Sequence, residues 1–113
     1  MEERRKFPRL KYPCKLILGG ENKVYSLHTE NISAGGLRVI LEKKLAINTP
    51  LSIELGLGLK DIKCKGRVVW VTDIKSLRTE KTNLFDTGIE FTQIEPQDRK
   101  TLRELIERIL KSS

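Results

Sequence analysis

Cysteine, histidine and aromatic residues are scarce in this chain of 113 residues, which has two cysteines, one histidine, three Phe, two Tyr and one Trp. Cys14 and Cys64 lie far apart in the sequence and form no Cys-x-x-Cys pair, and His28 is the only other soft ligand. This pattern excludes a metal site of the usual spacing, so we expect two buried, reduced thiols and no cofactor. The few aromatic residues also argue against a small basic barrel that binds nucleic acid, because such proteins usually place exposed aromatics among their basic residues.

Long apolar runs are missing as well. No stretch of about 18 apolar residues could form a membrane helix, and no apolar segment of the signal-peptide type follows the N-terminal charges. We therefore expect a cytoplasmic protein without a membrane span. The length predicts one domain with a modest core. The 22 Lys and Arg residues exceed the 15 Asp and Glu residues and give a net charge of +7, which favours an anionic partner such as a nucleotide, a nucleic acid or an anionic membrane face.

Sequence patterns of common enzymes are absent or incomplete. Gly56-Leu57-Gly58 lacks the third glycine and the following helix of a dinucleotide-binding fingerprint, and Ser33 does not lie in a nucleophile elbow. Asp86-Thr87-Gly88 spells the triplet of aspartic proteases, which use two facing carboxylates that share a proton. In those enzymes the triplet comes early in the chain, whereas here a charged segment follows it. We interpret the triplet as the entry to a strand and expect no catalytic activity.

Apolar residues alternate with polar residues over most of the chain, a period that is typical of half-buried strands. The alternation predicts strands over residues 10–18, 24–30, 37–41, 51–55, 62–71 and 88–91. Residues 31–36 are expected to form a loop, and residues 72–83 a mobile hairpin loop. Pro13 lies inside the first of these strands and predicts an edge or a bend there.

The apolar period changes after Glu95. Apolar side chains then recur at helical spacing, at Leu102, Leu105, Ile106, Ile109 and Leu110. Pro96 suits the first position of such a helix. The pattern therefore predicts an all-β domain of six short strands, closed or nearly closed into a barrel, with one C-terminal helix. We divide the domain into a flexible basic arm at 1–10, a barrel at 11–95 and the helix at 96–113.

The arm carries three arginines and one lysine within six residues, from Arg4 to Arg9. Pro8 fixes its own φ and favours an extended conformation at Phe7, so the arm is not a helix start. A charged segment of this kind requires an anion to hold it in place.

Two short motifs together resemble the signature of the PilZ domain, the bacterial receptor module for cyclic di-GMP. The first is the Arg-x-x-x-Arg of Arg5 to Arg9, and the second is the Asn-x-Ser-x-x-Gly of Asn31 to Gly36. Gly88 to Phe91 also matches a Gly-hydrophobic-x-Phe strand of that family. The resemblance covers nearly the whole chain and implies a six-stranded antiparallel barrel with a terminal helix.

The resemblance implies that Arg5 and Arg9 contact the ligand. An arginine fork pairs with phosphate oxygens and equally with O6 and N7 of guanine, so one residue type serves both parts of cyclic di-GMP. Arginine at the position of Arg4 is associated in the family with a stacked pair of ligand molecules. Trp70 matches a position where some PilZ domains place an aromatic side chain against a guanine, although a lone Trp in a small β domain often packs in the core.

The second motif supplies short polar groups and small residues. Asn31 offers an amide and Ser33 a hydroxyl to a base edge. Gly35 and Gly36 permit positive φ and let the backbone approach a ligand. Without the arm, the same motif would be an ordinary turn ahead of a strand.

From this resemblance we expect a receptor in which cyclic di-GMP orders the arm against the barrel and changes a surface offered to a downstream protein effector. Two alternatives stay open: an adaptor of the same family that binds no nucleotide, and, less favoured, a barrel that binds nucleic acid.

Overall fold

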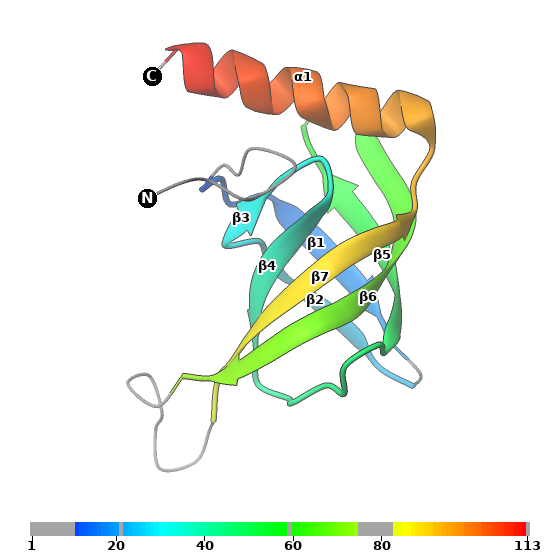
Figure 1. Cartoon of the computed structure of the whole chain (residues 1–113), viewed down its shortest axis with the longest axis vertical. Helices are drawn as coiled ribbons and strands as arrows, with labels where there is room; N and C mark the ends of the chain where they lie inside the picture. The colour runs from blue at the N-terminus through cyan, green and yellow to red at the C-terminus, as the bar shows by residue number, and fades with distance from the viewer. Residues whose placement is uncertain (1–10, 21, 59, 75–82, 113) are drawn as a thin grey trace.

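The computed structural model describes residues 11–20, 22–58, 60–74 and 83–112. The described chain forms one sheet with the strand order β2-β1-β5-β6-β7-β4-β3, in which every neighbouring pair is antiparallel. Figure 1 shows this sheet curled around a central core, with helix α1 lying across one end. The elements are β1 (Lys15–Gly19), β2 (Val24–His28), β3 (Asn31–Ile32), β4 (Gly36–Leu41), β5 (Pro50–Gly56), β6 (Asp61–Asp73), β7 (Phe85–Gln93) and α1 (Pro96–Ser112).

A single bent strand brings the two edges of the sheet together. Strand β2 pairs with β1 and strand β3 pairs with β4, and only Thr29 and Glu30 separate β2 from β3. The backbone of these two residues continues both pairings: the Thr29 amide donates to the Cys14 carbonyl at 3.0 Å, and the Glu30 amide donates to the Arg38 carbonyl at 2.7 Å. Six of the seven strands correspond to the six expected ones, and the seventh, β3, continues the chain of β2 beyond the bend. The predicted barrel with a C-terminal helix is confirmed.

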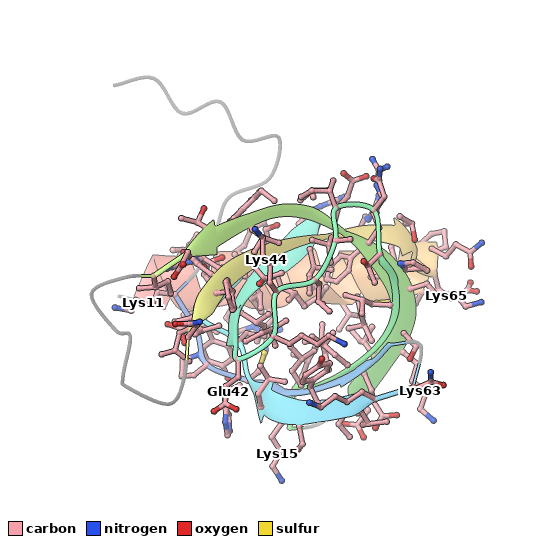
Figure 2. All side chains as sticks on the ribbon, turned by 90° about the horizontal axis from the view of Figure 1, so that it is seen from below. Lys11, Lys15, Glu42, Lys44, Lys63 and Lys65 are labelled. Carbon is pink, nitrogen blue, oxygen red and sulfur yellow. The ribbon has the colours of Figure 1, made fainter. Side chains whose placement is uncertain are left out.

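The core is filled by the alternate side chains that point into the barrel. In β4, for example, Leu37, Val39 and Leu41 are buried while Arg38 and Ile40 between them face outward and are half-buried. Burying one such side chain contributes about 1.5–3 kcal/mol. Figure 2 shows the barrel from below, with the strands encircling the core and Lys15 and Lys63 pointing outward.

Helix α1 covers one end of the barrel with one apolar face. Leu102 and Ile106 lie on that face and are fully or almost fully buried among the core residues. Asp98 in the first turn forms an ion pair with Lys60 in the β5–β6 connection, with 2.8 Å between Nζ and Oδ1. The helix begins at Pro96 as predicted, since proline suits the first helical turn. Among the described helical residues, no segment is long and apolar enough to cross a membrane.

Several predicted boundaries were wrong. The first strand begins at Lys15 rather than at residue 10, because the preceding stretch contains Pro13. The Thr29 side chain, instead of a regular strand pairing, forms hydrogen bonds with that stretch. The expected loop at 31–36 contains strand β3 and the first residue of β4.

The last strand begins at Phe85, three residues before Gly88, because β6 also runs further and pairs Thr72 with Asp86 and Asp73 with Phe85. Because most residues at these positions are polar, the alternation of apolar residues did not extend to either strand end. Residues 75–82 of the predicted mobile loop lie outside the described residues.

Candidate functional site

The turn between β3 and β4 is held together by Ser33. Its Oγ accepts hydrogen bonds from the amides of Gly35 and Gly36, at 3.1 and 3.2 Å, and its own amide donates to the Gly36 carbonyl at 2.8 Å. The Ser33 side chain is almost completely buried. The predicted site residue Ser33 therefore shapes the turn that presents Asn31 and the two glycines.

Gly36 is required because the turn lies directly against strand β7. A Cβ at Gly36 would overlap the backbone carbonyl of Ile89, and the Phe91 amide donates to the Gly35 carbonyl at 2.9 Å. The missing Cβ of Gly36 thus serves the packing of the turn against β7, and the approach of the backbone to a ligand stays a prediction. Neither Gly35 nor Gly36 uses the positive φ that glycine permits, because among the described residues only Asn48 and Gly58 adopt positive φ.

Four residues form a row across the outer face of strands β3, β4, β7 and β6. The register pairs Asn31 with Arg38, Arg38 with Gly88, and Gly88 with Trp70. The flanking residues Leu37, Val39 and Ile89 are buried in the core, so the row itself lies on the outside of the barrel. The structure therefore brings two predicted site residues, Asn31 and Trp70, onto one continuous surface.

Trp70 faces outward because of a β-bulge. Val68 pairs with Ile89 and Trp70 pairs with Gly88, so Val69 is the extra residue. A bulge shifts the alternation by one residue, and bulges are common where a side chain has to be re-aimed beside a site. The five-membered ring of the Trp70 indole lies over Gly88, where an added Cβ would overlap Nε1 and Cε2. Trp70 is half-buried on this face, not part of the interior.

Arg38 and Asp86 form an ion pair beside this row. Arg38 Nε lies 2.6 Å from Asp86 Oδ1, and the two side chains are 34% and 18% exposed. The hydrogen bond to Asp86 is the main reason that the pKa of Arg38 is raised, with a further contribution from the negative charge of Asp86 and an opposing one from burial. The carboxylate of the Asp86-Thr87-Gly88 triplet is thus bound to a guanidinium on the outer face. Sequence reasoning missed Arg38, although its position in an alternating strand next to Asn31 could have indicated it.

Thr29 fastens the beginning of the described chain next to the turn. Its Oγ1 donates to the Tyr12 carbonyl at 2.8 Å and accepts from the Cys14 amide at 3.1 Å. Thr29 is buried and lies two residues before Asn31. The chain that follows the arm therefore runs beside the Asn31–Gly36 motif. The predicted arm residues Arg4, Arg5 and Arg9 lie outside the described residues.

Both cysteines are free thiols, as expected, but only Cys14 is buried, while Cys64 is half-buried. Burial raises the pKa of Cys64 to about 11, with a smaller contribution from the negative charge of Asp98. Burial also raises the pKa of Cys14, and its contact with Thr29 opposes that shift. A raised pKa leaves little reactive thiolate at neutral pH. Within the described ranges, no group of three or more His, Cys, Asp or Glu residues could hold a metal ion.

The family model described as "PilZ domain" matches residues 3–108 of this chain. The chain belongs to the PilZ domain family. No curated protein matches it. The matched region includes both motifs, the row on the outer face and most of helix α1, so the PilZ resemblance seen in the two motifs holds over the whole domain.

Solved PilZ proteins have the same fold. The Inhibitor of motility of Bacillus subtilis (MotI/DgrA) superposes with a TM-score of 0.86 at 18% identity, over 99% of this chain and 54% of that one. The PilZ domain of YcgR from Escherichia coli, solved with c-di-GMP, gives 0.74 at 17% identity, over 97% and 94%. The MrkH–c-di-GMP complex of K. pneumonia gives 0.72 at 19% identity, over 98% and 55%. This chain thus spans about half the length of MotI and MrkH.

Proposed function

We propose that this PilZ domain is a cytoplasmic receptor for cyclic di-GMP without catalytic activity. The observation that carries the proposal is the fastening of the chain after the arm, through Thr29, beside the Asn31–Gly36 turn. Because Tyr12 follows Arg9 by only three residues, we infer that Arg5 and Arg9 act at the same surface as the second motif. The structures of YcgR and MrkH with c-di-GMP, which share the fold, support the choice of ligand.

The two motifs have different tasks in this proposal. The arginine forks of Arg5 and Arg9 bind phosphate oxygens and guanine edges, and Arg4 adds the charge that a second, stacked ligand molecule requires. Asn31 offers its amide to a base. Ser33 and Gly36 keep the turn against β7, so that the backbone around Gly35 stays close to the ligand. Trp70 offers its exposed face to a guanine for stacking.

Signal transmission follows from the charge of the arm. The positive side chains repel one another without an anion, and the two phosphates of cyclic di-GMP allow them to fold against the barrel. Ordering of a segment changes the surface that the domain presents, which is a common switching mechanism. The partner that reads this surface is a downstream protein effector.

The test is calorimetric titration of cyclic di-GMP into the wild-type protein and into Arg9→Ala, with GTP and single-stranded DNA as control ligands. We expect saturable binding by the wild type, a loss of about 5- to 150-fold in Arg9→Ala, and no binding of the controls. Arg103→Ala removes an equal charge from the exposed face of α1 and should bind like the wild type. The molar ratio tests the role of Arg4.

Absence of binding by a folded wild-type protein would contradict the receptor function and favour the adaptor. Binding of the DNA alone would instead favour the nucleic-acid barrel.

A further inference from the structure

We propose that Arg38, held in place by Asp86, is a further ligand-binding residue that reads the O6 and N7 acceptors of a guanine. This inference rests on the proposed function and deepens it, because it assigns a guanine-recognising group outside the two motifs. Arg38 lies on the outer face between Asn31 and Gly88. It therefore occupies the middle of the row that connects the Asn31–Gly36 turn with Trp70.

The ion pair leaves the recognition edge of the guanidinium available. Asp86 binds the Nε of Arg38 at 2.6 Å, and no hydrogen bond to another described residue engages Nη1 or Nη2. The side chain keeps 34% of its surface exposed. The two terminal nitrogens supply parallel donors, which is the pattern that bidentate contact with two neighbouring acceptors requires.

The charge balance favours a base over a phosphate as the ligand group. Because Asp86 already neutralises the guanidinium, Arg38 offers a phosphate less net attraction than the arginines of the arm would. A guanine edge is uncharged and requires donors in the correct geometry instead of net charge. Guanine presents two acceptors, O6 and N7, whereas adenine presents a donor, N6, in place of O6.

Trp70 lies where a stacked guanine would direct its edge toward Arg38. The indole extends from β6 across Gly88 of β7, toward β4. The Cα atoms of Trp70 and Arg38 are separated by two strand spacings, about 10 Å. Because Gly88 has no side chain, the indole ring itself lies over β7, with its five-membered ring on the side of Gly88. A base stacked on the outer face of the indole would direct its edge toward β4, where Arg38 lies.

The experiment measures binding of cyclic di-GMP and of its 7-deaza analogue, which lacks N7, to four proteins by calorimetry. These are the wild type, Arg38→Ala, Arg38→Lys and the control Arg67→Ala. Arg67 is the matched control because it also lies on the outer face and pairs with a carboxylate, Glu90, at 3.7 Å. Thermal unfolding of each protein shows that it is folded.

We expect Arg38→Ala to weaken binding of cyclic di-GMP about 5- to 150-fold and Arg67→Ala to change it less than about twofold. Lysine keeps the charge but not the fork, so Arg38→Lys should not restore affinity. The N7 penalty is the factor by which the 7-deaza analogue binds more weakly than cyclic di-GMP. It should be at least about threefold smaller in Arg38→Ala than in the wild type. A residue with a merely structural role would leave that penalty unchanged.

Three results would overturn the inference: affinity of Arg38→Ala within about twofold of the wild type, full recovery in Arg38→Lys, or an N7 penalty equal in both proteins. If Arg38→Ala fails to fold, the affinity of Arg38→Lys and its N7 penalty, each compared with the wild type, decide alone. Failure of the wild type to bind cyclic di-GMP would instead overturn the proposed function, so the two failures are distinguishable.

Discussion

Replacing Thr29 by valine should destabilise the domain more than the size of the change suggests. Valine has the shape of threonine, so it leaves almost no cavity at this buried position. What it removes is the hydroxyl that accepts from the Cys14 amide at 3.1 Å and donates to the Tyr12 carbonyl at 2.8 Å. These two bonds replace the strand pairing that is missing before β1.

The expected loss of unfolding free energy is about 2–4 kcal/mol. An unsatisfied donor such as the buried Cys14 amide costs about 1–3 kcal/mol, and the lost hydrogen bond to the Tyr12 carbonyl adds about 1 kcal/mol. The assay is equilibrium unfolding in urea, followed by far-UV circular dichroism, with the m-value checked for two-state behaviour.

Two variants serve as controls. Thr29→Ser keeps the hydroxyl and loses one methyl group, which should cost only about 1 kcal/mol. Thr87→Val is equally buried but removes a single bond, from Oγ1 to the Phe85 carbonyl, so it should cost about 0.5–1.5 kcal/mol. If Thr29→Val were less destabilising than Thr29→Ser, the hydroxyl would not be what fastens the chain after the arm, and the reasoning would be wrong.

Three further predictions concern the site face and the core. Gly88→Ala should displace the indole of Trp70 and shift the fluorescence of this only Trp to the red, and an unchanged spectrum would contradict the packing on Gly88. Leu102→Ala should cost about 2–5 kcal/mol in urea unfolding, since the side chain is fully buried under the helix; a loss below 1 kcal/mol would show that α1 does not seal the barrel. The thiol of Cys64 has a pKa raised to about 11, so native Cys64 should be alkylated at pH 8 on the order of 10- to 100-fold more slowly than in the unfolded chain. The alkylation rate of native Cys64 should rise with pH toward 11. The free energy of unfolding should fall above pH 9, because the thiol of the unfolded chain loses its proton first. Equal alkylation rates in the native and the unfolded chain, measured by peptide mass spectrometry, would contradict the burial of Cys64.

The alternation of apolar residues was sufficient to predict most of the barrel. Strand β4 begins one residue earlier than expected, β5 and β6 contain the predicted segments, and α1 begins at the predicted Pro96. These elements are amphipathic, and their burial alone determines which face points inward. The bend at Thr29 was not predictable in this way, because it depends on a side chain that bonds to residues 15 and 17 positions away.

The outer face was harder to predict than the core. Simple alternation from the inward Val68 would point Trp70 inward, and only the bulge at Val69 turns it outward. Arg38 has the pattern of an ordinary solvent-facing charge on a strand, and its importance depends on Asp86, 48 positions away. The motif residues Asn31 and Ser33 were identified from resemblance, but the role of Ser33 in holding the turn required the hydrogen bonds themselves.

The most direct test of the receptor account is a titration with cyclic di-GMP followed by NMR amide shifts. The account predicts saturable changes at Asn31, at the turn to Gly36, at Gly88 and at the indole N–H of Trp70. Signals of the turn that joins β1 to β2, at the end of the barrel away from α1, should stay unchanged (Figure 1). Changes confined to that turn, or no saturable change at all in a folded protein, would contradict the account.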